Sequence, residues 1–316
     1  MVSVFLDSES IEALRGRPFW TKLYWSVSII VSSLFGWALS VVLKDTIPGI
    51  AGSMALLTCF VLLWVIHRLL SKSTGPNFCT FSLLVQFFFR GAIVAVSIAM
   101  LLEVVGLSEL KPKYAKLRDL PISLIVGFSE ESGKFFSLLL GLCLVPTDLP
   151  AALARVGTSR RWSLCTRWWS VLIESPQSLV LAGIATGLGF MTTENIEYFS
   201  MIFSSLDTVS CIATALTRIF LNLHPLLTGL AAARLAHFTL TSPITAEIIF
   251  KSIWPSVLLH ALFDFGFMFA SDNPDDATAD TVVILLSLFL IPLSAFLLIS
   301  EYKSYSVRNP LQTVLV

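Results

Sequence analysis

Long apolar runs dominate this chain, and most charged residues lie in the segments between them. An α-helix needs about 20 apolar residues to cross a hydrocarbon core about 30 Å thick. Eight runs reach this length, which predicts an all-α, polytopic transmembrane helical bundle of about eight spans. The approximate bounds are Trp20–Leu43, Gly49–Leu70, Cys79–Glu103, Pro121–Val145, Gln177–Phe203, Thr208–Phe238, Ile244–Ala270 and Thr281–Ser300.

Composition agrees with this pattern. The 316 residues are 55% hydrophobic and only 13% charged, whereas soluble domains carry about 25% charged residues. We therefore expect residues 1–316 to form a single integral membrane domain in contact with the lipid bilayer. The formal net charge of +0 argues against a nucleic-acid partner. The five cysteines form no CxxC pair, so they indicate neither a disulfide framework nor a zinc knuckle.

Basic residues in the predicted loops suggest an orientation. Twelve Lys or Arg residues fall on the side of the N-terminus and five on the opposite side. Because cytosolic loops carry the excess of Lys and Arg, both termini are predicted to be cytosolic. The acidic loop that begins at Asp272 is then on the far side.

The fourth span carries charges inside an apolar run: Glu130, Glu131 and Lys134. Charges at this depth cost several kcal/mol and usually face a protein interior or a wet cavity. Lys134 follows the two glutamates by four and three residues, so it can share a helix face with either.

Three further spans carry polar residues at a similar depth. The residues that share this depth with Glu130 are Glu194 in the fifth span, His224 in the sixth and His260 in the seventh. The same spans also carry Asn195, Arg218, Asn222 and Asp264. Because isolated charges are costly in lipid, we expect spans four to seven to surround one polar cavity near mid-membrane. Charges that merely neutralise one another are the plainer interpretation, but a protein that needed only packing would use apolar residues.

Local features refine this expectation. Pro225 is expected to kink the sixth span beside His224. The spacing of Gly183 and Gly187 should let another helix approach closely. His67 and His237 lie near span ends, and we expect no chemical role for them.

The ordered set of motifs resembles a known family. Glu130-Glu131-x-x-Lys134, Phe190-x-x-x-Glu194-Asn195-x-x-Tyr198, His224 before a Thr-Gly, and His260-x-x-x-Asp264 follow one another on successive helices. This order is similar to that of the PrsW family of intramembrane proteases, which is related to the CAAX prenyl-protein proteases and bacteriocin-processing enzymes. The resemblance covers a motif-bearing core, residues 121–270, and implies an endopeptidase that cuts a membrane-anchored protein. The positions carried over are Glu130, Glu131, Lys134, Glu194, Asn195, His224, His260 and Asp264.

Peptide hydrolysis needs an activated water, stabilisation of an oxyanion and a proton for the leaving amine. We expect Glu130 or Glu131 to activate the water. His224 and His260 would hold the water and the oxyanion. The other roles are Asn195 as an amide donor, Asp264 as the group that orients His260, and Lys134, Arg218, Asn222 and Tyr198 as supporting residues.

A metal-assisted version uses the same residues. His224, His260 and Glu194 match a catalytic shell for a divalent ion such as zinc, with one open position. The residues are compatible with either mechanism.

Two other classes of protein remain open. A non-catalytic membrane scaffold could keep the fold without cutting anything. A proton-coupled carrier could use the same buried carboxylates and histidines, although no inverted repeat supports it. The presence of the carboxylates, both histidines and the aspartate favours the enzyme.

Overall fold

The computed structural model describes residues 58–59, 61–68, 81–108, 119–140, 142–144, 171–173, 176–202, 218, 223–239, 244–272 and 277–308. The predicted span Trp20–Leu43 and most of Gly49–Leu70 lie outside these residues. So does most of the long connection between the fourth and fifth predicted spans.

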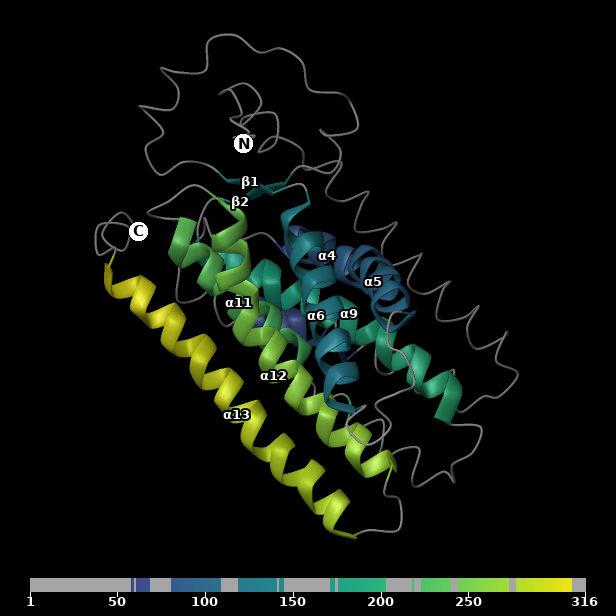
Figure 1. Ribbon diagram of the computed structural model, residues 1–316. Helices are drawn as coiled ribbons and strands as arrows, with labels where there is room; N and C mark the ends of the chain where they lie inside the picture. Colours follow the sequence, from purple (N-terminus) through teal and green to yellow (C-terminus); the bar gives the residue numbers. More distant parts are fainter. Residues whose placement is uncertain are drawn as a thin grey trace, which may run out of the picture.

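The described chain is a helical bundle, as the apolar runs predicted (Figure 1). Its helices are α4 (Phe81–Phe89), the π-helical turn η1 (Arg90–Ala95), α5 (Val96–Ser108), α6 (Asp119–Leu139), α9 (Pro176–Ile202), α11 (His224–Thr239), α12 (Ala246–Asp272) and α13 (Ala277–Arg308). Two three-residue strands, β1 (Leu142–Leu144) and β2 (Val171–Ile173), add a local parallel pairing. Figure 1 shows α13 along the outside of the bundle, beside α12.

Four helical segments of the described chain are long and apolar enough to cross a membrane: Leu83–Ser108, Gln177–Tyr198, Ala246–Phe269 and Thr281–Ser304. They correspond to four of the predicted spans. The total of eight spans remains a prediction. The segment Leu83–Ser108 runs through α4, η1 and α5, so it ends later than the predicted boundary at Glu103.

The fourth predicted span, Pro121–Val145, is too long at its end. α6 stops at Leu139, and β1 begins at Leu142. Buried Arg90 donates from Nη1 to the carbonyl oxygen of Leu140 at 2.5 Å. A cation at a helix C-terminus is favourable and satisfies a carbonyl that has no partner within the helix. Arg90, which had no role in the sequence analysis, therefore caps the helix that carries the acidic pair.

The sixth predicted span, Thr208–Phe238, is wrong as one continuous helix, because Leu223 lies outside helical structure and α11 begins at His224. The expected kink at Pro225 is wrong for the same reason. Pro225 occupies the first turn of α11, where the missing N–H costs no internal hydrogen bond. His224 therefore lies at the N-terminus of α11.

Close backbone contacts join α9 to α11, as the spacing of two glycines predicted. A Cβ at Gly183 would lie 2.7 Å from the oxygen of Thr228, and one at Gly187 would lie 2.5 Å from the oxygen of His224. Without Cβ atoms the two backbones touch, which is how small residues pack membrane helices. This contact carries Glu194, two turns beyond Gly187, toward His224.

α6 packs closely against α12 on one side and η1 on another, and glycines of α6 lie at both contacts. A Cβ at Gly127 would lie 3.0 Å from the backbone nitrogen of Ala261 in α12. A Cβ at Gly133 would lie 2.6 Å from the oxygen of Ala95 in η1. The charged stretch between these glycines is therefore enclosed by neighbouring backbones.

Gly189 should not tolerate alanine. Its Cβ would lie 1.8 Å from the backbone oxygen of Phe88. We expect Gly189→Ala to destabilise the protein by about 2 kcal/mol, because overpacking exceeds the gain of about 1 kcal/mol in helix propensity. Reversible unfolding in detergent measures this difference. The matched control is Gly266→Ala, whose new Cβ would meet only the Leu286 Cδ1 methyl within 3.8 Å, at 2.8 Å. Equal losses for the two variants would contradict the backbone-contact explanation.

The orientation of the chain remains a prediction that α13 makes easy to test. Its 32 residues form one helix about 48 Å long, enough to separate its ends across a bilayer. Single cysteines at Ser271 and Ser306 should be labelled from opposite sides, with Ser306 accessible from the cytosol. Labelling of both from one side would contradict the predicted topology.

Candidate active site

α6 supplies the centre of the site. Glu130, Glu131 and Lys134 are 8%, 2% and 0% exposed. The Lys134 ammonium Nζ lies 2.7 Å from Glu131 Oε1 and 3.3 Å from Glu130 Oε2. Both contacts follow from the three- and four-residue spacing along one helix face. Three charges that would be costly in lipid are thus paired before any other helix contributes.

His260 of α12 is held by Glu131. Its Nδ1 lies 2.9 Å from Glu131 Oε1, and because a carboxylate can only accept, Nδ1–H is the donor. In the neutral ring the lone pair is then on Nε2, which lies 3.5 Å from Glu130 Oε2 and 3.5 Å from Asp264 Oδ2. Asp264 Oδ2 is buried and has no hydrogen-bond partner among the described residues.

His224, the first residue of α11, has a matching arrangement. Its Nε2 lies 2.5 Å from Glu194 Oε2, so Nε2–H is the donor. The lone pair is then on Nδ1. This nitrogen lies 2.7 Å from Lys134 Nζ and 3.7 Å from Glu130 Oε2. Both histidines therefore present their acceptor nitrogens toward Glu130.

Arg218 links a second group of residues to Glu194. Its Nη2 lies 3.1 Å from Glu194 Oε1, and its Nε donates to Asn195 Oδ1 at 2.9 Å. Its guanidinium carbon lies 3.7 Å from the centroid of the Tyr198 ring. Asn195 is fully buried, and its Nδ2 has no hydrogen-bond partner among the described residues. The amide therefore has its orientation fixed through oxygen while its donors stay uncommitted.

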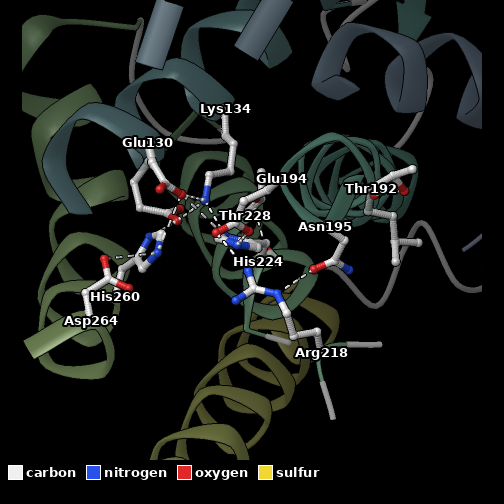
Figure 2. Close-up of polar contacts among 12 residues, drawn as sticks. Glu130, Lys134, Thr192, Glu194, Asn195, Arg218, His224, Thr228, His260 and Asp264 are labelled. Carbon is white, nitrogen blue, oxygen red and sulfur yellow. Dashed lines mark hydrogen bonds and ion pairs between the residues drawn. The ribbon is translucent and has the colours of Figure 1, made fainter. Parts of the chain in front are cut away.

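Figure 2 shows labelled side chains that come together from four helices: Glu130 and Lys134 of α6, Glu194 of α9, His224 of α11 and His260 of α12. The contacts above connect these predicted residues: Glu130, Glu131, Lys134, Glu194, Asn195, Tyr198, Arg218, His224, His260 and Asp264. Asn222 lies outside the described residues.

The other two histidines of the chain lie outside this cluster. His67 packs its ring on Phe81 at 5.5 Å, and His237 lies 3.3 Å from Glu301.

The residue that orients His260 differs from the one expected. Glu131 makes a 2.9 Å hydrogen bond to Nδ1 of His260, whereas Asp264 lies 3.5 Å from Nε2.

The sequence analysis gave no role to two residues near the site. The Phe190 ring lies 4.3 Å from Lys134 Nζ and 5.2 Å from the His224 ring. Glu103 of α5 lies between two contacts with α6, Gly106 against Ile125 and Ala99 against Gly133, so it is level with the acidic pair. A carboxylate near the end of an apolar run was the available signal for Glu103.

The residues present fit a divalent metal. One ligand atom each from Glu130, His224 and His260 lies within 4.8 Å of the others, and all three residues are buried. Two imidazole nitrogens and a carboxylate oxygen are a common zinc-type donor set. The unpartnered Asp264 Oδ2 faces the same His260 nitrogen. The carboxylate of this set is Glu130, whereas the sequence suggested Glu194, which lies on the other nitrogen of His224.

Comparison with known proteins agrees with this chemistry. The model of the PrsW family, described as intramembrane metalloproteases, matches residues 80–295. This chain belongs to the PrsW family. The match extends beyond the motif-bearing core in both directions and contains every residue of the cluster. No curated protein and no solved structure matches the chain.

Membership of the PrsW family makes the chain an intramembrane protease, a peptidase of the hydrolase class. It favours this function over the scaffold and the carrier. It also agrees with an integral membrane protein, since the described helices include four candidate spans.

The ion pair at the centre of the site should contribute strongly to stability. Glu131→Gln leaves the buried Lys134 ammonium without its nearest carboxylate, and breaking such a pair costs about 3–5 kcal/mol. We expect the double variant with Lys134→Met to lose less than the sum of the single variants. Reversible unfolding of all four proteins measures this coupling.

The matched control is the exposed pair of Glu247 and Lys251, which has the same charges in an i,i+4 arrangement. Its single and double variants should unfold almost like the unmodified protein. Additive losses at Glu131 and Lys134 would contradict a stabilising pair.

Proposed function

We propose that this protein is a metal-dependent endopeptidase that hydrolyses a peptide bond of a membrane-anchored protein. One observation carries the proposal. Each histidine is bound through one nitrogen to its own carboxylate, Glu131 or Glu194, and directs the other nitrogen toward Glu130. This pairing of an outer carboxylate with an inward-facing imidazole is typical of histidines that bind metals.

In this proposal Glu130, His224 and His260 hold the metal. Glu131 and Glu194 fix the tautomer and the ring orientation of the two histidines. When bound, the metal supplies Lewis acidity toward the attacking water and the scissile carbonyl. Glu130 is thus a ligand and Glu131 an orienting residue, so this proposal replaces the expectation that one of them activates the water.

Asp264 is the group best placed to accept the proton of the water. Its Oδ2 has no hydrogen-bond partner among the described residues and lies 3.5 Å from His260 Nε2. By contrast, Glu131 is already engaged by Lys134 and His260. As the water oxygen bonds to the carbonyl carbon, Asp264 takes its proton. It then returns a proton to the leaving amine as the C–N bond breaks.

Asn195 can stabilise the negative charge that develops on the carbonyl oxygen. Arg218 holds Asn195 Oδ1, so the Nδ2 donors keep a fixed direction. Preorganised donors of this kind commonly supply a large part of the stabilisation in acyl transfer. Arg218 in turn is held by Glu194 and by the Tyr198 ring.

The exposure of the side chains indicates where substrate enters. The side chains of Lys134 and Glu131 are 0% and 1% exposed, whereas those of Glu194, Asp264 and Arg218 are 17%, 20% and 23% exposed. Substrate therefore approaches along the side of α9 and the C-terminal half of α12. We place the polar cavity of the bundle on this side.

A mechanism without metal is the alternative. Glu130 lies within 3.7 Å of nitrogens of both histidines, so it could activate water directly. The imidazoles would then bind the oxyanion in their protonated form, with the inward nitrogens as donors. Metal content separates the two mechanisms.

Metal analysis of the purified, full-length protein tests the proposal. We expect one divalent ion per chain, lost in Glu130→Gln, His224→Ala and His260→Ala. Glu194→Gln should retain the ion with about 10–100-fold weaker affinity, because it removes only the outer partner of His224. Loss of the ion in Glu194→Gln with retention in Glu130→Gln would favour the set inferred from sequence. A wild-type protein that cleaves substrate without any metal would overturn the proposal.

Activity should follow the same division. With a single-span reporter protein in proteoliposomes, Asp264→Asn should keep the metal but lower the cleavage rate by about 10²–10⁴. His67→Ala and His237→Ala are the matched controls, since both histidines lie away from the cluster. Chelation should abolish cleavage, and added zinc should restore it. Full activity of Asp264→Asn would exclude Asp264 as the base.

A further inference from the structure

We propose that Lys134 is a tethered cation that competes with the metal for its ligands. The ammonium group contacts His224 and Glu130, and it has to leave both when the metal binds. This inference rests on the proposed metal-dependent function and concerns a residue of α6 that is not itself a ligand.

The ammonium group is fully committed in the structure. It has three N–H donors and no acceptor. Three acceptors surround it: Glu131 Oε1 at 2.7 Å, His224 Nδ1 at 2.7 Å and Glu130 Oε2 at 3.3 Å. Two of these three atoms belong to residues of the proposed ligand set. Lys134 therefore engages the same residues that the metal needs.

The two occupants exclude each other at His224. Its Nε2–H donates to Glu194, so Nδ1 carries the only lone pair of the neutral ring. That lone pair can accept from the ammonium group or bind a metal ion, but it cannot do both. Two cations on neighbouring atoms also repel each other, and the low dielectric of the buried site strengthens this repulsion. Metal binding therefore requires Lys134 to withdraw.

The structure provides a place for the withdrawn ammonium group. Glu131, its other close partner, is outside the ligand set and belongs to the same helix. The face of Phe190 lies 4.3 Å from Nζ and offers a cation–π contact. Lys134 can therefore release His224 and Glu130 while it keeps Glu131 and Phe190 as partners.

This arrangement has an energetic consequence. Without metal, the ammonium group neutralises buried carboxylates that would otherwise be costly, so the metal-free protein stays folded. With metal, part of the binding energy is used to displace Lys134. The measured metal affinity is therefore weaker than the ligand set alone would give.

The test measures the affinity for Zn²⁺ at fixed pH, by competition with a chromophoric chelator, for the full chain in detergent. Lys134→Met keeps an unbranched side chain that is one atom shorter, and it removes the charge and the donors. We expect this variant to bind Zn²⁺ at least about tenfold more tightly than the unmodified protein, within the usual range for coupled equilibria. Without Zn²⁺ its melting temperature should fall, and saturating Zn²⁺ should raise it by more than in the unmodified protein.

Lys251→Met is the matched control, because Lys251 also pairs with a glutamate but lies on the exposed face of α12. It should change neither quantity. If the unmodified protein binds Zn²⁺ and Lys134→Met binds it equally or more weakly, this inference is wrong but the proposed function stands. Absence of Zn²⁺ binding from the unmodified protein and from every variant would instead overturn the proposed function.

Lys134→Gln keeps a neutral hydrogen-bond donor and serves as a second variant if Lys134→Met does not fold. If either variant folds only when Zn²⁺ is supplied, the inference is supported, because the metal then replaces the missing cation. If both variants stay unfolded with Zn²⁺ present, Lys134 is a structural residue and the inference is wrong.

Discussion

The burial of paired charges within an apolar bundle is the constraint on which this structure depends. α6 carries two carboxylates and an ammonium group that are buried, so solvent cannot neutralise them. Its own Lys134 satisfies part of this requirement, and the rest comes from neighbouring helices. Histidines from α11 and α12 complete the hydrogen bonds, and α9 supplies the outer carboxylate Glu194. The arrangement of the helices and the chemistry of the site therefore depend on the same contacts.

Glycines determine how closely these helices can approach one another. Gly127 and Gly133 let α12 and η1 contact the backbone of α6, and Gly183 and Gly187 do the same between α9 and α11. Polar side chains of ordinary length reach across such contacts, so hydrogen bonds shorter than 3 Å form between different helices. In a membrane, where apolar burial does not drive helices together, this close packing and the polar contacts hold the bundle together.

Periodicity and depth in the sequence identified much of the site. The spacing of Glu130, Glu131 and Lys134 predicted a shared face, and the cost of intramembrane charge predicted that polar residues of four spans belong together. The sequence could not show which imidazole nitrogen faces which carboxylate, because that depends on helix rotation. It also missed the start of α11 at His224 and the cap that Arg90 places on α6, since both depend on contacts distant in sequence.

The π-helical turn η1 fixes the angular relation between the two halves of the segment Leu83–Ser108. A π-turn holds one residue more than an α-turn. Deleting a residue there would restore regular α geometry and rotate everything beyond it by about 100°. α4 would still pack on α9, but Ala99 and Gly106 would turn away from α6, and Glu103 with them. A single peptide unit between Arg90 and Ala95 thus acts as the phasing element that directs α5 toward the acidic pair.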